Sequence, residues 1–404
     1  MSKVYIVSAK RTPIGSFLGA LGSVHPAELG VTVVKAILDE NNIPKEDIDE
    51  LIVGNILPAG IGQGLGRQVS IGAGIPISVP AYSLNMVCGS GMKSIMNAYT
   101  SIKAGFHNVV LAGGTESMSG APFILPSKVR KGIKMGGINM KDHVIDDALT
   151  DVFNNVHMGI TAENIADKYN LSRLEQDEFA MLSQVKAIKA IDNGRFKEEI
   201  VPVIVKTRRG ETIVDTDEYP NRATNIEKLG KLRPAFKKDG SVTAGNSSGI
   251  NDGASFMLLV SEEALKKYDL KPLVEIVSIG QGGVEPLYMG LGPVPAIKNV
   301  FANIDLTLAD MGLLELNEAF SAQSLGVIHD LVEQHNLTRE QILERTNVNG
   351  GAIALGHPVG ASGNRITTTL IHEMLKRKTK YGLASLCIGG GMGTAIIVKN
   401  MEVN

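Results

Sequence analysis

The sequence predicts an α/β protein made of two similar halves, with a region of different character inserted into the first. Strand-like and helix-like segments alternate over residues 1–113, and a second alternation of the same plan covers 272–404. Residues 114–246 lack this regularity. We therefore expect a first half of 1–113 plus 247–271, an inserted loop domain of 114–246, and a second half of 272–404.

The first half is expected to hold strands and helices in turn. Its strands are predicted at 4–9, 51–57, 82–87 and 108–114, and its helices at 26–42, 67–73 and 90–105. In the last of these helices the apolar side chains recur at helical spacing. The segment ASFMLLV at 254–260 predicts a strand that returns to this half after the insertion.

The second half repeats the plan. Its strands are predicted at 273–280, 313–316, 383–388 and 394–400, and its helices near 295–302, from 317 to about 334, and from 358 to about 378. Within the insertion, Ser172 and Glu175 have the spacing of a capping box and predict a helix start. The basic run KVRKGIK at 128–134 is more typical of a solvated loop than of a binding site.

Cys88, in the run NMVCGSGM, lies between a predicted strand and a predicted helix. Unpaired N–H groups and the helix dipole lower the pKa of a thiol at a helix N-terminus. Gly89 and Gly91 have no Cβ that could block the approach of a substrate. These features favour a reactive nucleophile, and a small buried cysteine at a tight turn is the structural alternative.

His357 is the histidine that glycines bracket on a predicted loop, in the run GGAIALGHPVGASG. Pro358 suits the first position of a helix, which places His357 at a helix N-terminus. The positive end of the dipole disfavours an imidazolium and keeps the ring neutral, ready to accept a proton from a thiol. A histidine base with a cysteine nucleophile is a recurrent catalytic pair.

Two further residues are expected beside Cys88 and His357, at the same edge of the predicted sheet. Asn317 opens the run NEAFSAQ after an apolar strand and suits a helix N-cap, and Glu318 suits a first helical turn. Cys387 lies at the end of another strand, before a run of glycines. In open α/β sheets, ligands gather beyond the carboxyl ends of the strands. We therefore expect Cys88, Asn317, Cys387 and His357 to converge.

Four motifs together carry a family resemblance: NMVCGSGM, NEAFSAQ, GGAIALGHPVGASG and CIGGGMGTAIIV. Their order and approximate spacing resemble the thiolases, and the resemblance covers essentially the whole chain. It implies a five-layered α-β-α-β-α fold with two duplicated β/α halves. The runs VHMGITAEN at 156–164 and TAGNSSGINDGA at 243–254 are similar to those of the biosynthetic acetyl-CoA acetyltransferases.

The resemblance implies a reaction in which two acetyl-CoA form acetoacetyl-CoA and CoA, reversibly. Cys88 would attack the first thioester while His357 takes its proton, and Cys387 would remove a methyl proton from the second acetyl-CoA. His357 and a water held by Asn317 would stabilise the enolate. The backbone N–H groups of Cys88 and Gly389 would stabilise the tetrahedral oxyanion.

Other family positions line the channel for the acyl chain and the pantetheine arm, and one approaches the nucleotide. The positions that line the channel match Leu149, His157, Met158, Phe236, Ser248, Ala319 and Phe320 in this sequence. The position near the nucleotide matches Arg222. The run around Arg222 departs from the family spacing, and the apolar members also fit an ordinary core. No further cofactor is expected, since CoA is substrate and product, and no metal-ligand motif occurs. The inserted loop implies a homotetramer, a dimer of dimers.

Three alternatives stay open. A degradative 3-ketoacyl-CoA thiolase would use the same motifs on longer chains, and His157 beside Met158 argues against it. A decarboxylating ketoacyl synthase would carry histidine or asparagine in place of Cys387. A non-catalytic acyl-CoA or lipid carrier of the same fold would need neither thiol, nor His357, nor Asn317.

Composition excludes several partner classes. The 404 residues contain 40 Lys and Arg against 42 Asp and Glu, a net charge of -2, so a nucleic-acid partner is not expected. The charge-free stretch 68–92 contains Pro76 and Pro80, which break any uniform apolar helix, so no membrane span is expected. The first residues do not resemble a secretion signal, and we expect a cytoplasmic protein.

Overall fold

The computed structural model describes residues 3–208 and 210–403. The strands of the first half lie side by side in the order β4 (Ala81–Leu84), β3 (Glu50–Gly54), β5 (Val109–Ser117), β12 (Asn251–Ser261) and β1 (Val4–Arg11). Parallel pairs join β3 to β4 and β5, whereas β12 runs antiparallel to β5 and β1. The predicted return strand therefore pairs within the first half, although the three-part domain division remains a prediction.

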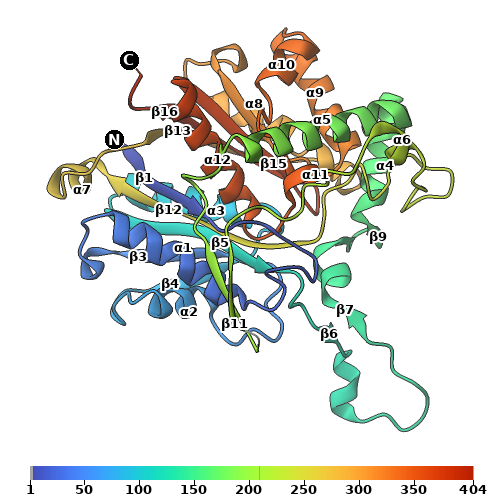
Figure 1. The fold of residues 1–404 in the computed structure, drawn as a ribbon, viewed down its shortest axis with the longest axis horizontal. Helices are drawn as coiled ribbons and strands as arrows, with labels where there is room; N and C mark the ends of the chain where they lie inside the picture. Colours follow the sequence, from blue (N-terminus) through green and yellow to red (C-terminus); the bar gives the residue numbers. More distant parts are fainter. Residues whose placement is uncertain (1–2, 209, 404) are drawn as a thin grey trace.

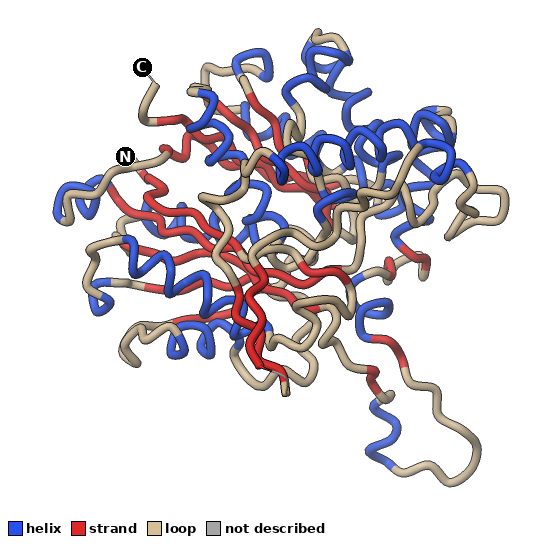
Figure 2. The backbone as a smooth tube through the Cα atoms, in the orientation of Figure 1, coloured by secondary structure: helices blue, strands red, loops and turns tan. Residues whose placement is uncertain are grey.

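The second half repeats this order, which confirms the predicted duplication. Its strands are β14 (Leu313–Leu316), β15 (Tyr381–Ile388), β16 (Met392–Asn400) and β13 (Val274–Gly283). Thr346 forms a parallel bridge to Leu314, at the position that β4 takes beside β3 in the first half. Two residue pairs, Tyr5–Glu275 and Ile6–Val274, join β1 to β13. These pairs join the sheet of the first half to the sheet of the second along one edge, and the strands of both halves lie in the interior of the molecule (Figure 2).

Helices complete the five layers (Figure 1). They are α1 (Pro26–Glu40) and α2 (Leu65–Gly72) outside the first sheet, α3 (Ser90–Lys103) and α12 (Ser362–Arg377) between the sheets, and α8 (Pro293–Phe301) and α9 (Ser321–His335) outside the second. The alternation of side chains along a strand explains this layering. In β12, Leu258 faces the α1 layer, whereas Met257 and Leu259 pack in the central core beside Ile95 of α3 and Ile366 of α12.

The insertion lies between β5 and β12. Its longer elements are α4 (Met158–Tyr169), α5 (Arg173–Asp192), β10 (Val203–Thr207), β11 (Gly210–Val214) and α6 (Ile226–Gly230). Ser172 and Glu175 form the predicted capping box of α5. The strands β6 (Phe123–Ile124) and β7 (Lys141–Asp142) support an arm that projects from the body and carries the exposed basic run (Figure 1).

Short elements fill the connections. They are β2 (Gly15–Ser16), β8 (Thr150–Asp151), β9 (Val156–His157), α7 (Glu262–Lys267), α10 (Arg339–Arg345) and α11 (Ala352–Leu355). Over residues 3–208 and 210–403, no helix has the length and apolar character that a bilayer crossing requires.

Candidate active site

Cys88 lies on a tight turn between β4 and α3. The preceding residue, Val87, has φ of +44°, a region that β-branched residues rarely adopt. Ser90 at the start of α3 holds this turn, because its hydroxyl accepts from the N–H of Met86 at 2.8 Å and donates to the carbonyl of Val87 at 2.7 Å. The strained turn presents the thiol beyond the end of β4.

The glycines around Cys88 serve close packing, and the open approach that the sequence suggested for them remains a prediction. A Cβ on Gly89 would lie 2.3 Å from the side chain of Ile388. A Cβ on Gly91 would lie 2.9 Å from the backbone nitrogen of Asn364, near the start of α12. The two glycines therefore let the Cys88 turn pack against the second half, where the Cys387 and His357 motifs lie.

The backbone N–H groups of Gly389 and of Cys88 itself lie near the Cys88 thiol and lower its pKa. Burial nevertheless raises the pKa of this thiol to about 11, and the two N–H groups offset only part of the shift. The predicted helix-dipole activation to a thiolate was therefore wrong, because desolvation outweighs it. The pKa of the buried Cys387 is raised as well, first by burial and then by the charge of Cys88.

His357 lies between α11 and α12, and α12 begins at Ser362 rather than at Pro358 as predicted. Its pKa is lowered to about 3, first by burial and then by the positive charge of Arg365, so the ring is neutral as expected. The ring Nδ1 is 2.6 Å from the Oγ of Ser362. The buried Nε2 has no hydrogen-bond partner among the described residues and is free to meet a substrate or a thiol.

Asn317 is not a helix cap, because α9 begins at Ser321 after Phe320. Its backbone N–H donates to the carbonyl of Ser385 at 3.0 Å, which fixes it beside β15. Both atoms of its buried side-chain amide lack partners in the described part of the chain. Unpaired buried amides are rare and mark a place where a ligand or water binds.

Glu318 is buried rather than placed in a first helical turn. Its carboxylate accepts hydrogen bonds from Ser183 of α5 at 2.6 Å and from Asn347 at 2.8 Å. A Cβ on Gly351 would lie 2.1 Å from this carboxyl group. Glu318 thus links the insertion, the Asn317 loop and the segment that leads to His357.

The predicted channel residues lie together around Cys387. The ring of Phe236 stacks on His157, with centroids 4.7 Å apart, and meets Phe320 edge-on at 6.1 Å. Met158 and Ala319 belong to the same apolar cluster as Cys387. The backbone N–H of Ser248 donates to the carbonyl of Ala319 at 2.9 Å. Leu149 packs instead in the neighbouring cluster, which contains Cys88.

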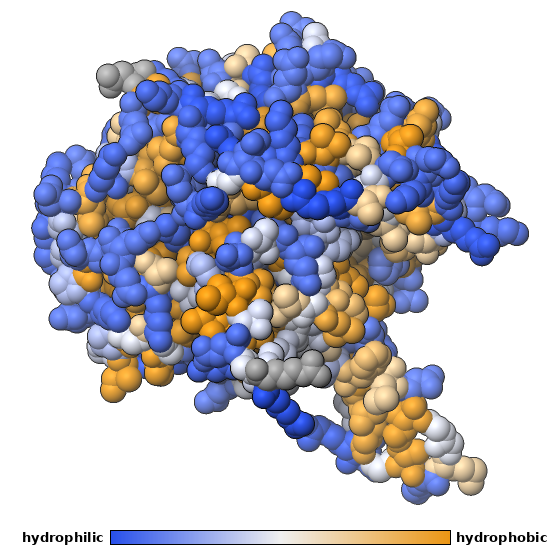
Figure 3. Space-filling model, viewed as in Figure 1, coloured by the Kyte–Doolittle hydropathy of each residue, from blue (hydrophilic) through white to orange (hydrophobic). Residues whose placement is uncertain are grey.

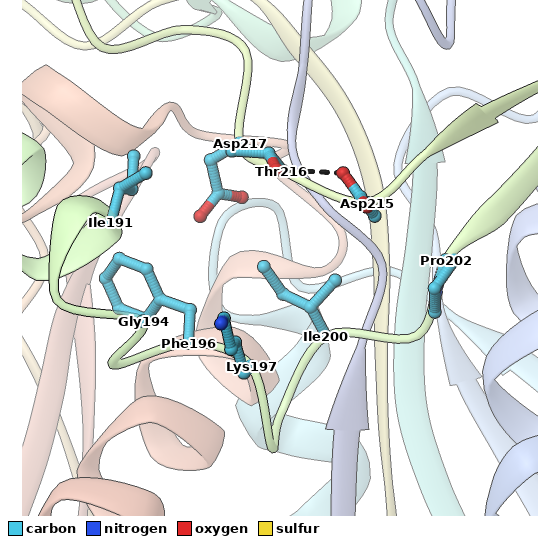
Figure 4. A pocket seen from close by; sticks show the side chains of 9 residues that line it. All are labelled: Ile191, Gly194, Phe196, Lys197, Ile200, Pro202, Asp215, Thr216 and Asp217. Atoms are coloured by element: carbon cyan, nitrogen blue, oxygen red, sulfur yellow. Dashed lines mark hydrogen bonds between the residues drawn. The ribbon is translucent and has the colours of Figure 1, made fainter.

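Arg222 lies at the surface, where its guanidinium pairs with Asp192 of α5 at 2.6 Å. The residues on either side of it, Asn221 and Ala223, line a cavity of about 320 Å³ that also reaches Lys228. A separate cavity of about 310 Å³ lies within the insertion (Figure 4). Its residues include Asp217 but none of the predicted site residues, and a salt bridge at 2.7 Å joins Asp217 to Arg11.

Two family models match the chain: "Thiolase, N-terminal domain" over residues 4–263 and "Thiolase, C-terminal domain" over residues 270–400. The chain belongs to the thiolase family. This thiolase chain is 50% identical over 399 residues to the acetyl-CoA acetyltransferase of Syntrophomonas wolfei, covering 98% of this chain and 99% of that protein.

Solved thiolase structures share the fold. The crystal structure of the Bacillus anthracis acetyl-CoA acetyltransferase matches with a TM-score of 0.95 and 42% identity, covering 99% of both chains. Human mitochondrial 3-ketoacyl-CoA thiolase in complex with CoA matches with a TM-score of 0.93 and 42% identity, covering 99% of this chain and 98% of that chain.

Sequence reasoning missed two residues of the thiolase site. Ser362 contacts the His357 ring, and Asn251 accepts a hydrogen bond from the backbone N–H of His357 at 2.9 Å. The sequence offered a weak signal for Ser362, which follows His357 by five residues within the same motif. It offered none for the contact of Asn251, which lies 106 residues away along the chain.

Proposed function

We propose that the chain is an acetyl-CoA C-acetyltransferase that condenses two acetyl-CoA into acetoacetyl-CoA and CoA, and that also runs in reverse by thiolysis. The observation that carries this proposal is that Cys88 packs in one cluster with Val359, two residues after His357, whose buried Nε2 has no hydrogen-bond partner among the described residues. The acetyl-CoA acetyltransferase names of the Syntrophomonas wolfei and Bacillus anthracis relatives support the choice of substrate.

The first step transfers an acetyl group to Cys88. At neutral pH the free enzyme holds a neutral thiol and a neutral imidazole, since the two pKa values are about 11 and about 3. The Nε2 of His357 takes the thiol proton as sulfur attacks the thioester carbonyl. The N–H groups of Gly389 and Cys88, which lower the pKa of the Cys88 thiol, stabilise the oxyanion that forms on the attacked carbonyl.

The leaving CoA thiolate takes the proton of Cys387, which leaves Cys387 as a thiolate base beside an imidazolium. Cys387 then removes a methyl proton from a second acetyl-CoA, and the Nε2–H of His357 with a water held by Asn317 stabilises the enolate. The enolate attacks acetyl-Cys88. When the carbon–sulfur bond breaks, the Cys88 sulfur recovers its proton from His357, so every proton is returned.

CoA would enter over the insertion. The acyl chain and pantetheine would lie among His157, Met158, Phe236 and Phe320, whose rings and thioether converge on Cys387. The cavity beside Arg222 is a suitable place for the nucleotide end, and it lies where Lys228 could meet phosphate. The reaction needs no cofactor besides the CoA esters and no metal, and reduced thiols favour a cytoplasmic setting.

A homotetramer is the assembly that we propose. The projecting arm exposes large apolar side chains, at Phe123 (63%), Leu125 (52%), Met135 (93%) and Met140 (64%). These residues give the arm its apolar surface in Figure 3. Such a patch on a protruding segment favours packing against the arm of another copy.

Steady-state kinetics test the proposed function. The rate of CoA release from acetyl-CoA alone measures condensation, and acetoacetyl-CoA with CoA measures thiolysis. We expect both activities, with acetoacetyl-CoA cleaved far better than a 3-ketoacyl-CoA that is six carbons longer. Equal kcat/KM for the two esters would place the chain with degradative 3-ketoacyl-CoA thiolases, and no turnover of any ester would favour a carrier.

A further inference from the structure

The hydroxyl of Ser362 makes two contacts that together fix the protonation pattern of His357. Its Oγ lies 2.6 Å from the Nδ1 of the ring and 2.9 Å from the carbonyl oxygen of Pro358, to which it donates. A serine hydroxyl has one proton to donate and two lone pairs that accept. The carbonyl of Pro358 can only accept, so when Oγ donates its one proton there, the oxygen accepts from Nδ1, which then carries the hydrogen.

A neutral imidazole holds one ring proton, so a proton on Nδ1 leaves a lone pair on Nε2. This is the nitrogen that is buried and unpartnered in the described structure. The backbone of His357 is fixed independently, since its N–H donates to Asn251 at 2.9 Å. Gly356, with φ of +103°, lies against the Asn251 side chain, where a Cβ would be 2.6 Å from its amide carbon. The backbone of His357 is therefore held in place, and Nε2 is the ring nitrogen left free to meet other groups.

We propose that Ser362 is a positioning residue that holds His357 in the Nδ1–H tautomer, so that Nε2 alone exchanges protons with the reacting groups. The inference rests on the proposed function and deepens it. Nε2 accepts the proton of Cys88, donates that N–H to the enolate oxygen, and returns the proton to the Cys88 sulfur. Nδ1 keeps its proton throughout, and Ser362 accepts from it in both the neutral and the charged state.

If the Ser362 hydroxyl only stabilised the local turn, it would not select between the two neutral tautomers of His357. The hydroxyl also closes a local turn at the start of α12 through the Pro358 carbonyl, which is a common use of serine. Thr367 makes the same kind of bond one turn later, from its Oγ1 to the carbonyl of Gly363 at 2.9 Å, and no hydrogen bond joins it to the His357 ring. Thr367→Val is therefore a matched control that removes a buried α12 hydroxyl without touching the tautomer.

The direct test is ¹⁵N NMR of histidine-labelled protein, with His357→Asn used to assign the signal. In the unmodified protein we expect a protonated Nδ1 and an unprotonated Nε2 for His357. In Ser362→Ala we expect a mixture of tautomers, whereas Thr367→Val should retain the single tautomer. A proton on Nε2 in the resting unmodified protein would overturn the proposal, and this measurement does not depend on activity.

Kinetics give a second readout. Ser362→Ala should lower kcat at least about tenfold, because a positioned base contributes roughly 10²- to 10⁴-fold and the wrong tautomer cannot accept the proton. KM should change less than about twofold, and Thr367→Val should leave both constants near those of the unmodified enzyme. A Ser362→Ala enzyme with unchanged kcat would contradict the inference. Absence of turnover in the unmodified enzyme would instead contradict the proposed function, while the tautomer result would still stand.

Discussion

The backbone N–H of Gly389 lies close enough to the sulfur of Cys88 to lower the pKa of this thiol. This contact joins the turn before α3 in the first half to the turn after β15 in the second. Each half alone supplies only part of the candidate site: the first carries Cys88, the nucleophile that we propose, and the second carries His357, Asn317 and Cys387. Duplication therefore places the proposed reaction at the junction of the halves.

The raised pKa of Cys88 predicts how its reaction with an alkylating agent depends on pH. Only the thiolate is nucleophilic, so with a pKa of about 11 the alkylation rate should rise about tenfold per pH unit between roughly 7 and 10. Iodoacetamide labelling of a Cys387→Ala variant, followed by mass spectrometry, measures this rate for Cys88 alone. A plateau near neutral pH would mean that the resting enzyme already holds a thiolate.

Replacing Asn317 should slow the condensation step but not the acetylation step. Asn317→Ala removes the unpartnered amide proposed to hold the water that stabilises the enolate, and loss of such a donor costs roughly 10²- to 10³-fold in rate. Acetylation of Cys88 should proceed nearly as in the unmodified enzyme. Rapid-quench acetylation and steady-state condensation measured on the same sample separate the two steps, and equal losses in both would contradict the assignment.

The packing of Gly351 against Glu318 predicts a stability effect. Gly351→Ala would drive a methyl group into the buried carboxyl group and should lower the free energy of unfolding by about 1 to 3 kcal/mol. Gly137→Ala is the control, since a Cβ there meets no atom within 4 Å, and it should change stability by less than about 0.5 kcal/mol. Denaturant unfolding measures both, and similar values for the two variants would count against the contact.

The exposed apolar side chains of the arm lead to a prediction about the oligomeric state. Replacing Phe123, Leu125, Met135 and Met140 by serine should convert a tetramer into a smaller species, because the exposed apolar surface that we propose to pair is lost. Light scattering coupled to size-exclusion chromatography gives the mass directly. The arm residues lie outside the site, so condensation activity should persist; an unchanged tetramer would show that another surface holds it together.

Much of this architecture was readable from the sequence, because strands, helices and glycine-rich turns leave local patterns. The motifs that hold Cys88, His357, Asn317 and Cys387 were recognised in this way, and the catalytic roles of these residues remain predictions. The pKa of Cys88 was not, since desolvation depends on atoms that the fold brings in from distant segments. The helices expected at Asn317 and Pro358 begin four residues later, at Ser321 and Ser362.

Covalent labelling tests the central claim most directly. After incubation with acetyl-CoA and acid quenching, intact-mass measurement should find one added acetyl group on the unmodified chain and on Cys387→Ala, and none on Cys88→Ala. Cys387→Ala should form no acetoacetyl-CoA and should not exchange the methyl protons of acetyl-CoA with solvent. An acetylated Cys88→Ala protein at the level of the unmodified chain, or full condensation by Cys387→Ala, would contradict the two-thiol mechanism.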